Sequence, residues 1–398
     1  MNIKETLTKL VNFFLILFVL FTVLPIKLNY SSITIIILSL LAIINLFFSK
    51  ERKKSFKNYS LFLISIPFFI YALGVFNSSN VDYALKFLSK NLSFIAFPLI
   101  FFSFNNYIKQ KKIYVAFLLG LAITNIYLIF LFFYNFNFGA KFYMIISLDI
   151  YHSTYLGMYN LVAYWVCLML FRKEKKKLYL FFGLFFIFSA IITSARIIFI
   201  LSFFSVLGTI FFLLKSNTKK ILILVSAVFI GFLFIFNIPS IKQKFNQINE
   251  INKLGFDQNN YQSISSRFGK IEASLNVIKN NFWFGTGTGD MIDELVKEYK
   301  KNNFLMGYKY KYNPHNQFLD NIVRNGIIGG GICIISIYLL PLYFSIRQKN
   351  KILTAFILVI SGVSLTESIL DVHKGITFYV FFITLMIYSI LNNKRFLI

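Results

Sequence analysis

Residues 178–214 read LYLFFGLFFIFSAIITSARIIFILSFFSVLGTIFFLL, and this stretch decides the class of fold. Its single charged residue is Arg196, which follows Ser194 and Ala195. About 20 predominantly apolar residues are enough for a helix to cross the hydrocarbon core of a bilayer. The stretch therefore predicts two membrane-spanning helices that meet close to the arginine.

The rest of the chain repeats this pattern. Of its 398 residues, 57% are hydrophobic and 52 are Phe, which makes the chain far more apolar than a soluble domain. We predict an all-α integral membrane protein with about twelve transmembrane helices and one long external (periplasmic) loop that carries amphipathic helices. Its parts are residues 1–238 with spans one to nine, the loop 239–316, and residues 317–398 with spans ten to twelve. The expected spans are 10–28, 32–49, 60–77, 86–104, 113–134, 153–171, 178–194, 195–214, 221–238, 326–345, 352–370 and 375–392.

The distribution of charge predicts the topology. The net charge of +26 could suggest nucleic acid, but more than half of the 41 Lys and Arg residues lie in short segments that alternate with nearly uncharged ones. The positive-inside rule makes these segments cytoplasmic, so both termini are expected inside and residues 239–316 outside. We expect a multi-pass protein that contacts membrane lipids and no nucleic acid. The basic segments contain Lys4 and Lys9, residues 50–54, residues 109–112, residues 172–177, Lys215 with Lys219 and Lys220, residues 347–351, and Lys394 with Arg395.

The external loop contains signals for two helices. Apolar residues recur at three- and four-residue spacing and predict an amphipathic helix on the membrane surface, with Ser265 or Ser266 as its cap and Arg267 in its first turn. Asp290 is expected to cap a second helix that runs to about Lys301. The apolar residues of the first helix are Phe268, Ile271, Leu275, Ile278 and Phe282.

Between these helices lies the sequence Gly285-Thr286-Gly287-Thr288-Gly289. It lacks the Lys-Ser/Thr of a phosphate-binding loop and lies on the side of the membrane where ATP is absent. We interpret it as a tight turn, with the alternative that its amides help to seat an anion.

His315 is the first candidate catalytic residue. Asn313-Pro314-His315 can form the cap and the first two residues of a helix that enters the membrane, where the helix dipole would keep the imidazole neutral, as a general base requires. Asn316, Asp320 and Arg324 follow at four-residue spacing as a polar stripe that suits a sugar. The alternative is an ordinary histidine at the membrane interface.

Two arginines are candidates for binding phosphate. A charge such as Arg196 between apolar segments is costly to insert and therefore a functional candidate, although it can also snorkel to lipid headgroups. Arg267 alone would be an ordinary surface residue. Together, two guanidiniums on the outer face suit a diphosphate, because each can donate paired hydrogen bonds to a phosphate.

The remaining polar candidates lie on the same predicted side. Glu367, Asp371 and His373 cluster at the outer end of one span, and His152 begins another. The three histidines come from distant loops without a ligand motif, so no metal site is expected. Cys167 and Cys333 both fall in spans, which leaves neither a disulfide framework nor a cysteine-based metal site.

Taken together, these features resemble the O-antigen ligase family, bacterial membrane glycosyltransferases that also include O-antigen and exopolysaccharide polymerases and protein O-oligosaccharyltransferases. The resemblance covers most of the chain. It depends on Ser194-x-Arg196, on Arg267 with its helix and the Gly285-x-Gly287-x-Gly289 turn, and on His315-Asn316-x-x-Leu319 with Gly326 and Gly329 downstream. One departure is Arg324, where family members more often have an acidic or neutral residue; it can pair with Asp320 or alter the choice of acceptor.

The resemblance implies an enzyme of the bacterial inner membrane whose active site faces the periplasm. Arg196 and Arg267 would hold the diphosphate of an undecaprenyl-linked glycan, and His315 would activate an acceptor hydroxyl, with lipid A-core as the main expectation. Transfer would invert the anomeric carbon and need no metal or other cofactor. The secondary site candidates are His152, Asn316, Asp320, Glu367 and Asp371. The sequence leaves open whether His315 is the only base, because Glu367 or Asp371 could approach the same site.

Three alternatives remain open from the sequence, two of the same family and one of another class. A polymerase would use the same donor with a second lipid-linked glycan as acceptor, and a protein O-oligosaccharyltransferase would use a protein. A glycolipid flippase or other transporter would also have many spans, but it predicts charges near the membrane midplane and a pseudo-repeat between halves. The spans here are nearly free of charge, and the 239–316 segment breaks such symmetry.

Overall fold

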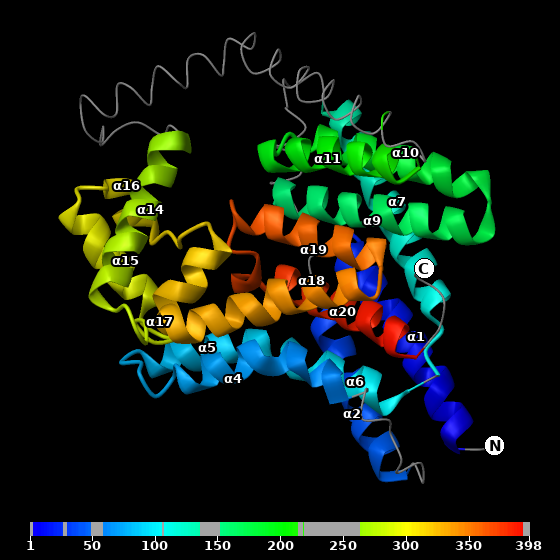
Figure 1. The fold of residues 1–398 in the computed structure, drawn as a ribbon, viewed down its shortest axis with the longest axis horizontal. Coiled ribbons are helices and arrows are strands. Elements are labelled where there is room, and N and C mark those ends of the chain that lie inside the picture. The colour runs from blue at the N-terminus through cyan, green and yellow to red at the C-terminus, as the bar shows by residue number, and fades with distance from the viewer. Residues whose placement is uncertain are drawn as a thin grey trace.

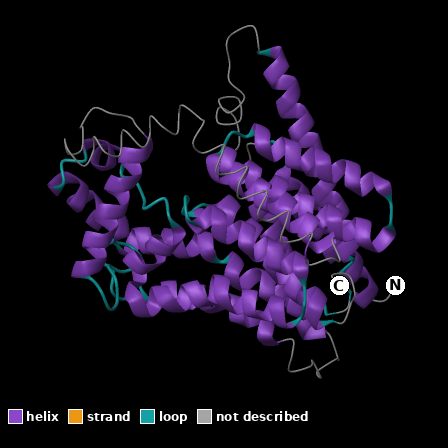
Figure 2. Cartoon of the chain, turned by 45° about the horizontal axis from the view of Figure 1, so that its top comes forward, coloured by secondary structure: helices purple, strands orange, loops and turns teal. Residues whose placement is uncertain are grey.

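The computed structural model describes residues 3–26, 30–48, 59–105, 107–135, 152–213, 218 and 263–392. Every regular element in these ranges is helical (Figures 1 and 2). The first half contains α1 (Ile3–Val23), α2 (Tyr30–Phe48), η1 (Ser60–Ser65), α4 (Ile66–Leu73), α5 (Val81–Asn91), α6 (Ser93–Ser103), α7 (Gln110–Tyr134), α9 (Ser153–Glu174), α10 (Lys177–Ile192) and α11 (Arg196–Leu213). The second half contains α14 (Ser263–Asn280), α15 (Met291–Lys301), α16 (Leu305–Tyr310), α17 (Gln317–Ile334), η3 (Ile335–Leu339), α18 (Leu340–Arg347), α19 (Lys351–Ser364), η4 (Ile369–Asp371) and α20 (His373–Leu391).

Seven of the described helices are long and apolar enough to cross a membrane, and four shorter helices are also apolar. These helices fall on eleven of the twelve expected spans, while the expected span 221–238 lies outside the described residues. The predicted all-helical membrane class is confirmed, and the count of twelve stays a prediction. The seven long ones are Lys4–Val23, Tyr30–Phe48, Val81–Ser103, Gln110–Tyr134, Ser153–Glu174, Gln317–Arg347 and His373–Leu391; the shorter ones are Ser60–Leu73, Lys177–Ile192, Arg196–Ile210 and Lys351–Ser364.

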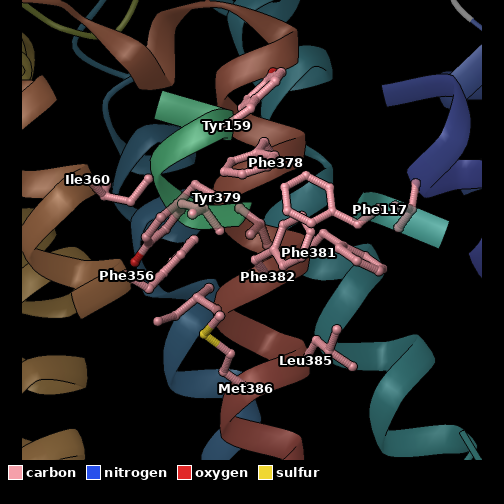
Figure 3. Packing of buried hydrophobic residues seen from close by; sticks show 14 of the residues in the cluster. Phe117, Tyr159, Phe356, Ile360, Phe378, Tyr379, Phe381, Phe382, Leu385 and Met386 are labelled. Carbon is pink, nitrogen blue, oxygen red and sulfur yellow. The ribbon is translucent and has the colours of Figure 1, made fainter. Parts of the chain in front are cut away.

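The core of the bundle forms around α9 and α20, whose residues are almost all buried. Aromatic rings of α20 interlock with neighbouring helices, as Figure 3 shows; Phe378 stacks on Tyr159 of α9 at 4.2 Å between ring centroids. Phe381 packs against rings from α1 and α6. In a membrane such contacts hold helices together by van der Waals packing, because lipid removes most of the hydrophobic drive between them. The abundant Phe therefore serves both the interior and the lipid-facing surface, where Phe47 and Phe188 are exposed.

Three of the described basic segments lie together at one end of the bundle. Lys4 lies over the ring of Tyr107 at 4.8 Å, and Lys111 pairs with Glu174 at 2.6 Å. These contacts bring the start of α1, the loop before α7 and the end of α9 together. α14, α15 and α16 lie on the opposite side of the molecule (Figure 1). This arrangement agrees with the predicted topology, whose orientation in a membrane stays a prediction.

The α14–α16 layer has its own small core, and it corrects two details of the sequence interpretation. α14 is already helical at Ser263, so Ser265 and Ser266 lie inside the helix and Arg267 lies beyond its first turn. Asp290 precedes α15 as expected, but its carboxylate does not cap that helix. It accepts hydrogen bonds at 2.7 Å from two backbone amides in the loop before α5 and so anchors the layer to the bundle. The small core consists of Ala273, Val277, Met291, Leu295, Tyr299 and Val323.

The outer face of α14 is apolar and exposed, as the helical spacing predicted. Phe268, Leu275 and Phe282 all remain accessible, and Trp283 is 62% exposed at the end of this stripe. Single exposed apolar residues are ordinary, but a continuous stripe of this kind suits contact with lipid. The stripe supports the predicted position of α14 on the membrane surface.

Candidate functional site

The site is organised by a break in α17. Gly326 has φ +65° and ψ −173°, which interrupts the helix and frees backbone groups on both sides of the glycine. The segment after α14 satisfies these groups: Thr286 N donates to Val323 O at 2.9 Å, and Ile327 N donates to Phe282 O at 2.8 Å. Irregular backbone at membrane depth is tolerated where protein groups satisfy it in this way. The break explains why Gly326 accompanies the Gly-Thr-Gly-Thr-Gly turn.

The Gly-Thr-Gly-Thr-Gly turn is structural. All five of its backbone amides donate to protein acceptors: Asn281 O, Val323 O, Arg324 O, Gly74 O and Ser78 Oγ. A Cβ at Gly285 would lie 2.3 Å from Gly326 N, so the two backbones meet where only glycine fits. The interpretation as a turn is therefore supported, and its amides are already used by the protein rather than turned toward an anion.

His315 lies in a turn before α17 and not inside a helix, which corrects the expected capping pattern. Asn316 is the helix cap, and its Oδ1 accepts from Phe318 N at 2.9 Å and Leu319 N at 3.1 Å. His315 has φ +47°, a left-handed conformation that is uncommon for a residue with a side chain. Asn313 Oδ1 stabilises the turn by accepting from His315 N at 3.1 Å. Backbone strain of this kind is often found at functional sites.

The imidazole of His315 is paired with a carboxylate. Its Nδ1 lies 3.1 Å from Glu367 Oε2, and the two side chains are 35% and 15% exposed. An ionised carboxylate only accepts hydrogen bonds, so this contact selects the tautomer with the proton on Nδ1. The Nε2 lone pair is then available to accept a proton. Glu367, a secondary candidate from the sequence, thus lies in direct contact with the expected base.

A buried ion cluster lies directly behind His315. Arg324 is fully buried and its Nε donates to Asp320 Oδ1 at 2.8 Å, which is the pairing within the helix that the sequence offered as one of two alternatives. Its Nη2 also donates to Asp371 Oδ1 at 2.9 Å, and Asp371 Oδ2 accepts from Asn313 Nδ2 at 3.1 Å. Asp320 and Arg324 therefore face the protein interior, and the expected open polar stripe is wrong at these two positions. Sequence spacing could not show the contribution of Asp371, which comes from another loop.

Two further hydrogen bonds fasten the start of α17 to the segment after α19. Asn316 Nδ2 donates to Leu365 O at 3.3 Å, and Gln317 Oε1 accepts from Leu370 N at 2.7 Å. Asn316, which was expected to contact substrate, is thus occupied in capping and in this tie. The loop that carries His315 and the loop that carries Glu367 are therefore fixed relative to each other by several hydrogen bonds.

Arg196 and His152 reach the same end of the bundle on other helices. Arg196 is the first residue of α11, follows a left-handed Ser194, and has an exposed side chain. His152 is exposed just before α9. Ile198 of α11 packs closely on Gly157 of α9, which places the two helix starts together. These residues are positioned by α9 and α11 rather than by the loops that hold His315.

Arg267 is exposed on α14, one turn before Lys270. The sequence did not identify Lys270 as a site candidate. Its side chain is buried, with only 7% of its surface exposed. Its ammonium lies over the ring of Tyr312 at 4.2 Å, and the edge-on contact between Tyr312 and His315 has a centroid distance of 6.2 Å. The charges of Glu367 and Arg267 both act on Lys270. Its position three residues after Arg267 was the one signal in the sequence.

The remaining histidine has a different environment. His373 Nε2 lies 3.2 Å from Ser32 Oγ of α2. Among the described residues, no group of three or more His, Cys, Asp or Glu side chains is placed to hold a metal ion. Cys167 and Cys333 are free and buried.

Fold and site together define a polytopic membrane protein with a polar site built at the ends of its helices. Residues 181–334 match the family described as O-Antigen ligase, and this range includes Arg196, Arg267 and His315. The match confirms the resemblance drawn from the motifs: residues 181–334, less than half of the chain, are similar to this family, whose members are glycosyltransferase-like ligases and polymerases. Glu367 and Asp371 lie beyond the matched range.

A second comparison finds a relative without an assigned activity. The chain is 30% identical over 151 residues to an uncharacterized protein of Haemophilus influenzae (strain ATCC 51907 / DSM 11121 / KW20 / Rd). The similar region spans 36% of this chain and 37% of the length of that protein.

Proposed function

We propose that this protein transfers a glycan from undecaprenyl diphosphate to an acceptor hydroxyl, with lipid A-core as the acceptor, on the periplasmic face of the bacterial inner membrane. The 3.1 Å contact between His315 and Glu367 carries the proposal, because it provides an oriented base within a chain that matches the O-antigen ligase family. The active site faces the side of the membrane opposite the basic segments.

The proposed step is an inverting displacement. The acceptor hydroxyl gives its proton to His315 Nε2 while its oxygen forms a bond to the anomeric carbon of the glycan. The bond from that carbon to the diphosphate oxygen breaks, and its electron pair leaves on undecaprenyl diphosphate. Glu367 stabilises the imidazolium that forms, as a carboxylate does in other histidine-based sites.

Arg196 and Arg267 are proposed to bind the diphosphate leaving group. Their paired donors can bind the charge that develops on the diphosphate, which a bound cation would otherwise stabilise. General-base catalysis contributes about 10²- to 10⁴-fold, so positioning and charge stabilisation must supply the rest of the rate. His152 is proposed as a further contact for glycan or diphosphate. The proposed chemistry uses no cofactor.

The first experiment measures transfer to lipid A-core by the purified protein with a chelator present. Wild type is expected to transfer the glycan, and His315→Ala, Arg196→Ala and Arg267→Ala are expected to lose most of this activity while remaining folded. Lys309→Ala serves as a control, because this lysine lies on α16 with its ammonium over the Tyr310 ring. Full activity of the His315 variant would remove the proposed base, and loss of activity with the chelator would contradict metal independence.

The same preparation separates the acceptors. Incubation with donor alone is expected to give no ladder of longer lipid-linked glycan, and a ladder would identify a polymerase. Transfer to a protein acceptor in place of lipid A-core would identify a protein oligosaccharyltransferase. If the protein instead moves labelled glycolipid across vesicles without forming a product, the activity is transport.

A further inference from the structure

Lys270 is a buried cation without a matching carboxylate in the described part of the chain. Its ammonium contacts the face of Tyr312 at 4.2 Å, and no ion pair or hydrogen bond to another described residue accompanies this contact. An ammonium removed from water is costly unless an opposite charge compensates it, and a cation–π contact compensates only in part. A bound anion would supply the opposite charge that the described residues do not provide.

The neighbours of Lys270 indicate where that anion would lie. Arg267 is three residues earlier on α14, so both cations project from adjoining positions of one helix. On the other side, the Tyr312 ring separates Lys270 from His315, with 6.2 Å between the two ring centroids. The charge of Glu367 also reaches Lys270. The lysine thus lies between one proposed phosphate-binding residue and the proposed base.

We propose that Lys270 is a third cationic contact for the diphosphate of the lipid-linked donor, between Arg267 and His315. This inference rests on the proposed function, because it assigns the anion to the leaving group of the transfer reaction. The diphosphate gains negative charge when its bond to the glycan breaks, so the leaving group carries more than two guanidiniums neutralise, and an ammonium can bind a further phosphate oxygen as a point charge.

Protonation links this contact to pH. Burial lowers the pKa of Lys270 to about 8; the Glu367 charge opposes this shift and Arg267 adds to it. A bound anion favours the ammonium, so affinity for diphosphate is expected to fall as pH rises from 7 to 9. Nearby groups on the packed segments are Tyr312 and His315, together with Tyr299, whose hydroxyl donates to Tyr312 O, and Glu298, which pairs with Lys301 and accepts from Asn276 of α14.

The test measures binding of farnesyl diphosphate to the full-length protein in detergent, with farnesol as the uncharged probe. Binding needs neither acceptor nor catalysis, so it separates the lysine from the transfer step. Lys270→Met is expected to weaken binding by about tenfold or more at pH 7 and to remove most of its decrease between pH 7 and 9. Lys270→Arg is expected to restore binding at pH 7 and to keep it at pH 9. Lys279→Met, at an exposed position near the end of the same helix, is the matched control.

The outcomes distinguish two failures. If Lys270→Met binds as wild type while Arg267→Ala binds weakly, Lys270 is not a diphosphate contact and the proposed function stands. If wild type does not bind the diphosphate in preference to farnesol, the proposed donor class is wrong together with this inference. A purely structural lysine would lower the thermal stability in both Lys270 variants without changing the pH dependence of binding.

Discussion

The guanidinium of Arg324 lies 2.9 Å from the carboxylate of Asp371, and this contact joins the helix after His315 to the loop after α19. Asp371 in turn accepts from Asn313, which holds the backbone of His315. A fully buried cation thus controls, through two side chains, the turn that carries the proposed base. Positioning of this kind is what a catalytic site needs from the residues behind it.

Arg324→Met is expected to destabilise the protein by roughly 3–5 kcal/mol, because it leaves the buried Asp320 carboxylate without its partner. Thermal unfolding in detergent measures the change. Arg347→Met is the control, since this arginine is exposed and contacts only a tyrosine hydroxyl at 3.1 Å among the interactions described. A variant in which Asp320, Arg324 and Asp371 are all made neutral should recover part of the loss. Wild-type stability in Arg324→Met would show that the cluster is not stabilised by charge pairing.

Gly326→Ala is expected to destabilise α17 severely, whereas Gly331→Ala is harmless. At Gly326 a side chain would have to adopt φ +65°, and its Cβ would lie 2.3 Å from the Trp283 backbone, which adds a clash to roughly 1–3 kcal/mol of strain. At Gly331 nothing lies within 4 Å, and alanine favours a helix by roughly 0.5–1 kcal/mol. Expression and unfolding temperature of the two variants test the difference. Equal behaviour would mean that the break in the helix is not required.

Glu367→Gln is expected to slow transfer, by less than the roughly 10²- to 10⁴-fold loss expected for His315→Ala. Its amide cannot reproduce the carboxylate that orients Nδ1–H and stabilises the imidazolium. Because the two residues act as a unit, the double variant should be no slower than His315→Ala alone. Initial rates with saturating acceptor provide the measurement, and Glu272→Gln at an exposed position of α14 is the control. Additive losses in the double variant would show that the two residues act independently.

The buried position of Lys270 also predicts how the free energy of unfolding depends on pH. Burial lowers its pKa in the folded protein from 10.5 to about 8, so between these values the unfolded chain binds more protons and stability rises with pH. The penalty for the buried charge is fully present below about pH 8 and disappears toward pH 10.5. Lys270→Met should therefore be stabilised relative to wild type at pH 7, and less so at pH 10, as unfolding temperatures at the two values will show. If the difference in unfolding temperature between Lys270→Met and wild type is the same at both pH values, burial does not lower the pKa of Lys270. Lys279→Met again serves as the control.

The sequence predicted several local features correctly because each depends on residues close together in the chain. The pair of Asp320 and Arg324 follows from four-residue spacing on a helix. The apolar stripe on α14 follows from helical periodicity, and the position of Asp290 before α15 from its type. Local signals failed where two partners competed: Asn316 and not Asn313 caps α17, and Asp290 binds the amides of a distant loop instead of its own helix.

The sequence by itself determined that this is a helical membrane protein, because the length and apolarity of each segment are local properties that a bilayer requires. Only the tertiary structure decided which groups surround His315. Glu367, Asp371 and Lys270 are separated from it by about 45 to 56 positions in the chain. They lie near it because the broken helix α17, its glycine turn and the buried Arg324 bring two loops and helix α14 to one place, and contacts of that kind depend on packing between helices that no local pattern encodes.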